Sequence, residues 1–107
     1  MKPTTGEAKF AVGQVIHHRL FDYRGVIVDV DPEFQGTEEW YAQVALTRPP
    51  RDIPWYHVLV HDLSRETYVA ERNLEADFSG EPVEHPYVDR VFAAFKDGTY
   101  VSHRSTN

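Results

Sequence analysis

The sequence contains no cysteine, which excludes disulfide bonds, thiol nucleophiles and thiolate-bound metals. It also lacks a long hydrophobic run. The longest, at residues 91–95, is far shorter than the roughly 20 residues that a membrane-spanning helix requires. Residues 1–7 include no apolar stretch of the kind that a secretion signal carries. We therefore expect a soluble, cytoplasmic protein with no membrane partner.

Positive charge is scarce, because 11 Lys and Arg stand against 17 Asp and Glu, which gives a net charge of −6. Residues 66–89 alone sum to −6 (one base, seven acids), whereas residues 1–24 sum to +2 (four bases, two acids). Proteins that bind nucleic acid usually carry a basic patch or stripe. Composition alone therefore disfavours nucleic acid as a partner.

Strand-forming residues are abundant. Valine outnumbers leucine 13 to 5, and Trp, Tyr and Phe (2, 6 and 6) supply 14 aromatic side chains. A chain of 107 residues has the size of one domain with a modest core. We expect a single domain over residues 9–102, with flexible ends at residues 1–8 and 103–107.

Hydrophobic periodicity places short strands at five positions, namely residues 12–20, 26–31, 55–62, 66–71 and 99–102. In the second of these, Val26, Val28 and Val30 alternate with acidic residues, which is typical of a half-buried strand with the valines on one face. Tight turns join neighbouring strands, so we predict a mainly β fold built as a small antiparallel barrel.

Two helical segments interrupt the strands. Thr37 can cap a short helix from Glu38 to about residue 46, which lies in a long excursion between the second and third strands. Near the C-terminus, Val88, Val91, Phe92 and Phe95 recur at helical spacing, with a glycine at position 98 where a C-cap glycine belongs (Pro86 would occupy the first turn). We therefore predict a C-terminal helix.

The six histidines do not form an evident metal site. His57 and His61 have the i, i+4 spacing that chelates a metal on a helix. On a strand, however, the two residues stand roughly 13 Å apart, at ~3.3 Å per residue. His17 and His18 are adjacent, so their side chains point to opposite faces of a strand. We expect no bound metal and interpret the histidines as half-buried polar residues of strands.

Catalytic motifs are not apparent either. The serines lie in turns without a Gly-x-Ser-x-Gly elbow, and the scattered glycines form no phosphate-binding loop. The carboxylate pair Glu38 and Glu39 is explained by the helix dipole, and Asp29 with Asp31 by a solvated strand face. We therefore expect neither an enzyme nor a cofactor.

Four aromatic residues lie at the two ends of the excursion, namely Trp40, Tyr41, Trp55 and Tyr56. An exposed aromatic cluster could hold a peptide or a flipped base. The alternative is that these rings belong to the core and attach the excursion to the barrel. In so small a protein the core interpretation is favoured.

Five blocks of the sequence resemble the YccV-like, hemimethylated-DNA-binding domain family, whose free-standing bacterial members are called heat shock protein HspQ. The blocks are Lys9–Pro32, Pro54–Val60, Thr67–Leu74, Gly80–Pro86 and the ending Phe95-x-x-Gly98-x-Tyr100. Together they span about residues 9–102. The resemblance implies an SH3-like barrel. It also implies two activities, the binding of hemimethylated DNA and a heat-shock role in which a Lon-type, ATP-dependent protease degrades certain proteins.

Two hypotheses about function follow. The first is a non-enzymatic heat-shock adaptor whose partners are an ATP-dependent protease and its substrate proteins. Its candidate binding surfaces are the excursion (Glu38, Trp40 and Tyr41) and the acidic loop at residues 75–84. The alternative is a hemimethylated-DNA-binding module that uses Lys9, Arg19 and Arg24. The resemblance supports this alternative, whereas the net charge opposes it. A homo-oligomer is compatible with either hypothesis.

Overall fold

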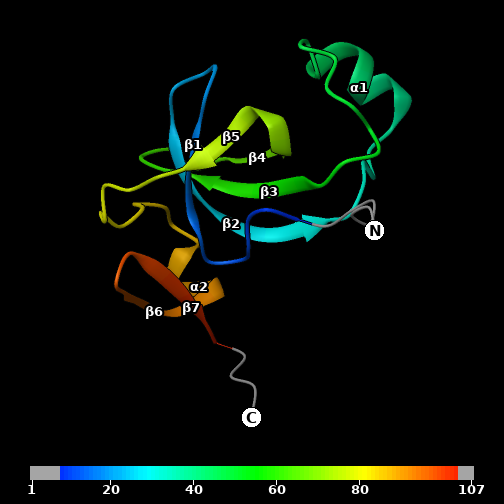
Figure 1. Cartoon of the computed structure of the whole chain (residues 1–107). Coiled ribbons are helices and arrows are strands. Elements are labelled where there is room, and N and C mark those ends of the chain that lie inside the picture. The colour runs from blue at the N-terminus through cyan, green and yellow to red at the C-terminus, as the bar shows by residue number, and fades with distance from the viewer. Residues whose placement is uncertain (1–7, 104–107) are drawn as a thin grey trace, which may run out of the picture.

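The computed structural model describes residues 8–103 and places most of them around one sheet. Five strands form an antiparallel sheet in the order β4–β3–β2–β1–β5 (Figure 1). They are β1 (Val15–His18), β2 (Arg24–Asp31), β3 (Trp55–Val60), β4 (Glu66–Ala70) and β5 (Leu74–Ala76). Two more strands, β6 (Phe92–Lys96) and β7 (Thr99–Ser102), form a hairpin. The helices are α1 (Glu38–Val44), α2 (Val88–Val91) and a 3-10 turn at Glu71–Asn73.

This arrangement confirms the expected mainly β fold with five antiparallel strands. The hydrogen-bonded ladder ends at β4 on one side and at β5 on the other, so closure into an SH3-like barrel stays a prediction. The predicted flexible ends lie outside the described residues, apart from residues 8 and 103. Across residues 8–103, none of the helices has the length and apolarity needed to cross a bilayer.

The central strand β2 is buried on both faces. Val26 and Val28 pack in a first core cluster, whereas Ile27 and Val30 pack in a second cluster on the opposite face. The strand register shifts between Ile27 and Asp29, which marks a β-bulge. The prediction that Val26, Val28 and Val30 share one face is therefore wrong for Val30. The extra residue of the bulge reverses the alternation of side chains beyond it.

Helix α1 forms as predicted. The hydroxyl of Thr37 accepts a hydrogen bond from the Trp40 N–H at 3.1 Å and so caps the first turn. Seven residues make a marginal helix in isolation, so packing has to hold it. Tyr41 and Ala45 supply that packing, because both are buried in a third cluster with residues from β3 and β4.

The predicted C-terminal helix is wrong beyond Val91. Helix α2 has only four residues, and the chain continues as strand β6, which pairs with β7. The reason lies in the Asp97–Gly98 turn, where both residues have positive φ (54° and 81°). An Asp-Gly turn of this kind is a strong hairpin signal, and it outweighs an apolar pattern that spans only two helical turns. The short strand predicted at residues 99–102 is confirmed as β7.

Backbone hydrogen bonds of Gly13 join the β6–β7 hairpin to the main sheet. Its N–H donates to the carbonyl of Ile27, and its carbonyl accepts from the N–H of Tyr100, both at 2.8 Å. Its φ is +93°, and a Cβ at this position would lie 2.3 Å from the Tyr100 carbonyl oxygen. The close approach of two backbones therefore requires glycine here.

Replacing Gly13 with alanine tests this junction. We expect Gly13→Ala to lower the free energy of unfolding by about 3 kcal/mol, because the added Cβ meets both a left-handed backbone and a clash. Gly80→Ala is the matched control, since Gly80 has a φ of +76° and no atom lies within 4 Å of the place that a Cβ would occupy. That variant should lose about 1 kcal/mol. Equal losses in chemical denaturation would show that the hairpin junction is not tightly constrained.

Candidate functional site

A groove of about 530 Å³ runs along strand β4. All five residues of β4 line it. One wall comes from α1 and the segment after it, through Trp40, Val44 and Leu46. The other wall comes from the β1–β2 loop, through Phe21 and Tyr23. The groove thus unites three segments that are separate in the sequence, at residues 21–23, 40–46 and 66–70.

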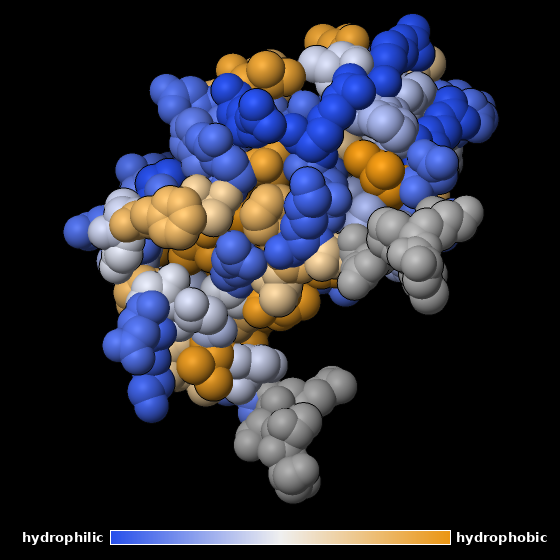
Figure 2. All heavy atoms as spheres, viewed as in Figure 1, coloured by the Kyte–Doolittle hydropathy of each residue, from blue (hydrophilic) through white to orange (hydrophobic). Residues whose placement is uncertain are grey.

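The walls of the groove expose large apolar side chains. Leu46 is 73% exposed and Phe21 is 66% exposed, and Val44 and Leu63 are also exposed. Two separate groups of hydrophobic spheres lie at the top of the molecule, one over the β1–β2 loop and one beside the end of α1 (Figure 2). Large exposed apolar side chains around a groove are typical of an interaction site.

His18 shapes the β1–β2 wall. It is only 3% exposed, and its Nδ1 accepts hydrogen bonds from the N–H groups of Leu20 and Phe21 at 3.1 and 3.0 Å. Its ring also stacks on Phe21. Burial lowers the pKa of His18, which favours the neutral ring that can accept these bonds. The loop is tied to β4 by a 2.7 Å hydrogen bond between the hydroxyls of Tyr23 and Thr67.

An aromatic cluster supports the α1 wall. The ring of Trp55 lies 4.9 Å from Phe34 and 5.2 Å from Tyr68, and Trp40 lies 5.7 Å from Tyr68 (centroid distances). The indole N–H of Trp55 donates to the carbonyl of Pro50 at 3.1 Å, which fastens the excursion to β3. These contacts hold α1 at a fixed position above β4.

The three predicted protein-binding residues of the excursion have different environments. Tyr41 is 8% exposed and its hydroxyl donates to the Pro49 carbonyl, so this ring belongs to the core. Trp40 is half-buried and lines the groove. Glu38 is exposed and pairs with Arg51, whose guanidinium lowers the pKa of the Glu38 carboxyl. The core interpretation of the aromatics is thus confirmed for Tyr41, and Trp40 alone of the three contributes to the groove.

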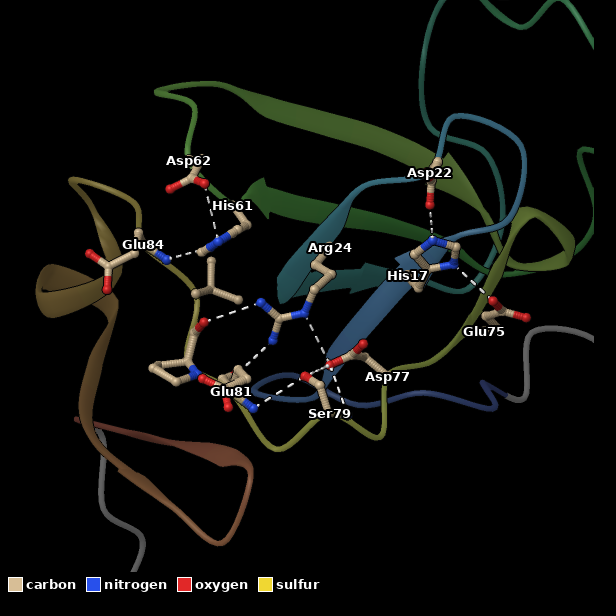
Figure 3. A network of polar contacts seen from close by, with 12 residues as sticks. His17, Asp22, Arg24, His61, Asp62, Glu75, Asp77, Ser79, Glu81 and Glu84 are labelled. Carbon is tan, nitrogen blue, oxygen red and sulfur yellow. Dashed lines mark hydrogen bonds and ion pairs between the residues drawn. The ribbon is translucent and has the colours of Figure 1, made fainter.

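Arg24, one of the predicted DNA-binding residues, fastens the acidic loop. Its guanidinium contacts Asp77 at 3.1 Å and donates to the carbonyls of Glu81 and Pro82 (Figure 3). The arginine side chain is only 21% exposed. Its charge is therefore engaged within the protein, and the same contacts hold the loop at residues 77–82 against the sheet.

The other two predicted DNA-binding residues, Lys9 and Arg19, are exposed. The structure attaches both to the region of the 3-10 turn through their backbones. The N–H of Lys9 donates to the Glu71 carboxylate, and the N–H of Arg19 donates to the Asn73 carbonyl. Of the predicted basic patch, two side chains are free of ion pairs among the described residues and the third is engaged.

His17 lies between two carboxylates. Its ring nitrogens are 2.7 Å from Asp22 and 2.8 Å from Glu75 (Figure 3). The hydrogen bond to Asp22, followed by that to Glu75, raises the pKa of His17. The ion pairs connect the β1–β2 loop to β5.

The histidine pair considered as a metal site is separated in the structure. His57 contacts Asp31 and Glu66, whereas His61 contacts Asp62 and the backbone of Glu84. Among the described residues, a different group, consisting of Asp29, Asp31 and His57, brings ligand atoms within 4.8 Å of one another. The hydroxyl of Tyr68 donates to Asp31 at 2.7 Å, and His57 contacts the same carboxylate oxygen at 3.2 Å. Hydrogen bonds account for the contacts of Asp31 with Tyr68 and His57, whereas the Asp29 carboxylate accepts a hydrogen bond from the N–H of Val30.

Three residues of the groove, Phe21, Leu46 and Leu63, were not predicted from the sequence. Each is a large apolar residue inside a polar turn or loop, which is the one signal that could have pointed to them. Their role becomes visible only when the fold brings them around β4.

The chain matches a known family. Residues 8–99 match the family model described as "YccV-like: Hemimethylated DNA-binding protein YccV like". The match covers nearly all of the described residues, including every strand of the five-stranded sheet and both walls of the groove.

The His17 ion pairs give a prediction for pH dependence. A raised pKa means that His17 stabilises the fold fully below its unfolded value of about 6.5, and that this contribution is lost as pH rises through the folded value. His17→Gln should therefore destabilise the protein more at about pH 5.5 than at about pH 8.

The measurement is chemical denaturation of the wild type and the variant at both pH values. His85→Gln serves as a control, because the hydrogen bonds of its ring go to backbone groups rather than to carboxylates. If His17→Gln lowers the free energy of unfolding by the same amount at both pH values, the assigned ion pairs are contradicted.

Proposed function

This chain belongs to the YccV-like family of hemimethylated DNA-binding proteins, and from that premise we propose that it is a protein-binding adaptor. It binds unfolded polypeptide in the groove along β4 and promotes its degradation by a Lon-type, ATP-dependent protease in the cytoplasm. It contributes no catalytic group and no cofactor of its own. The groove is the observation that carries this proposal.

The groove suits a polypeptide better than a nucleic acid. Its walls are formed by apolar side chains, several of which are exposed. Apart from two histidines, the described residues that line it include only one base, Arg65, and one acid, Glu66. In a protein with a net charge of −6, this lining is electrically neutral. An apolar, neutral groove gains free energy by removing apolar side chains from water and offers little to phosphates.

The heat-shock character of the resembling proteins supports the protease as a partner. An adaptor needs a surface that captures substrate, and it needs no reactive group. The polar side chains nearest the groove are engaged with one another: Glu66 with His57, and Tyr68 with Asp31. They hold the walls in place, which is what a binding site requires.

DNA binding is the second candidate, and the description of the family model favours it. The predicted patch offers Lys9 and Arg19, because Arg24 is engaged with Asp77 and with the loop carbonyls. Two phosphate contacts would give weak binding.

A charge placed in the groove tests the adaptor proposal. Leu46→Asp should weaken binding of a fluorescently labelled, permanently unfolded reporter protein by at least about tenfold, since an apolar contact is lost and a charge must lose its water. The variant should also slow degradation of the same reporter by the ATP-dependent protease. Leu46 is 73% exposed, so the fold should tolerate the change.

Phe78→Asp is the matched control. Phe78 is 92% exposed and lies outside the groove, and the substitution adds the same charge. The affinity of Phe78→Asp for the unfolded reporter protein should stay within about twofold of the wild-type affinity. The proposal fails if the two variants bind the reporter equally well, or if the wild type does not bind it at all.

Measuring DNA affinity as a function of salt concentration tests the alternative function. With Lys9 and Arg19 as the only contacts of the predicted patch, the slope of log affinity against log salt should be about −2, at ~0.9 per neutralised phosphate. The affinities for hemimethylated and unmethylated duplexes should differ by about fourfold, which is the effect expected from burying one methyl group. Nanomolar binding of the hemimethylated duplex at about 200 mM salt would instead make DNA the principal partner.

A further inference from the structure

We infer that the groove binds its partner by strand addition. In this mode, an extended, uninterrupted apolar segment of an unfolded protein pairs its backbone with the outer edge of β4. The inference rests on the proposed protein-binding function and specifies the form and chemistry of the bound segment.

Strand β4 has an unpaired edge. It lies at the end of the sheet and pairs only with β3. The pairing alternates, because Val60 donates to the carbonyl of Arg65 and Glu71 donates to the carbonyl of Pro54. The N–H groups of Glu66, Tyr68 and Ala70 therefore point away from β3, as do the carbonyls of Glu66 and Tyr68. Between residues 8 and 103, no hydrogen bond from another segment reaches these five groups.

The part of this edge at residues 66–68 lacks the usual protection of an outer strand, whereas Val69 and Ala70 are buried. Natural edge strands are blunted by lysine, proline or a bulge, or are covered by another segment. The sequence of β4 is Glu-Thr-Tyr-Val-Ala, without lysine or proline, and its pairing with β3 has no register shift. An unprotected edge at the bottom of an apolar groove is suited to pair with an incoming strand.

The two walls determine which side chains such a strand needs. Tyr68 and Ala70 face the α1 cluster, whereas Val69 faces the second core cluster and Thr67 contacts Tyr23 of the β1–β2 loop. An added strand would likewise direct alternate side chains to the α1 wall and to the loop wall. Both walls are apolar, so both sets of side chains should be apolar.

The partner is therefore an uninterrupted apolar segment about as long as β4, which has five residues. Continuous apolar runs of this kind are typical of strands that are buried on both faces in a folded protein. They become accessible only when that protein unfolds. The net charge of −6 around a neutral groove further favours a segment flanked by basic rather than acidic residues.

N-methylated peptides test this inference with the wild-type protein. The probe is a peptide of five apolar residues flanked by two lysines on each side. An N-methyl group removes one backbone donor, and alternate donors of an extended peptide lie on opposite edges. One version has three methyl groups on alternate residues, so that one edge stays intact. The other has the same number divided between both edges, so that neither edge is intact.

Strand addition requires that the peptide with an intact edge binds like the unmethylated peptide. The peptide with both edges blocked should lose at least about tenfold in affinity, because its bonds to β4 cannot all form. Equal affinity of the two methylated peptides would overturn strand addition, since their apolar surface is the same. If the unfolded reporter protein still binds in that case, only this inference fails. If nothing binds, the proposed function fails as well.

Discussion

The sheet ends at β4, and the unpaired backbone of that strand is the constraint on which the site depends. Backbone N–H and C=O groups need partners, and at an edge they obtain them from water or from another chain. In this protein, residues of α1 and of the β1–β2 loop line the groove beside this edge. The same two segments leave Leu46 and Phe21 exposed beside it. Hydrogen-bonding capacity and apolar surface therefore coincide in one place, as a peptide-binding groove requires.

The polar network explains how an acidic protein maintains this geometry. The buried ring of His18 shapes the β1–β2 loop, and the hydroxyls of Tyr23 and Thr67 connect that loop to β4. Arg24 neutralises Asp77 and holds the acidic loop, while Arg51 pairs with Glu38 of α1. The arginines that could have formed a basic surface are thus used in part to fasten loops. The same contacts hold the acidic loop and α1 in place.

Local signals were sufficient to predict most of the fold. The Thr37 cap, the strand at β2 and the hairpin between β3 and β4 depend on residues close in sequence, and all three occur. The prediction of a C-terminal helix was wrong because four apolar residues at helical spacing fit a short hairpin equally well, until the Asp97–Gly98 turn is considered. Strand β5 was missed because it has only three residues and takes its pairing from β1.

The site was far less predictable than the fold. The choice of Trp40 was useful, because this residue of α1 lines the groove. The groove itself consists of residues near positions 21, 46 and 66–70, which no local pattern relates to one another. Arg24 was likewise predicted to bind DNA because its ion pair with Asp77, more than 50 residues away in the sequence, could not be predicted. Contacts between segments distant in the sequence determine which exposed side chains line the same groove. Local sequence patterns do not predict those contacts.

Amide hydrogen exchange, followed residue by residue with and without an unfolded reporter protein, tests the central claim most directly. In the free protein, the amides of Thr67 and Val69 should exchange slowly, because they pair with β3, and those of Glu66 and Tyr68 should exchange fast. On binding, these two fast amides should become protected, in the alternating pattern of a newly paired strand. Protection confined to the region of Lys9 and Arg19, with no change along β4, would contradict a protein-binding groove at this edge.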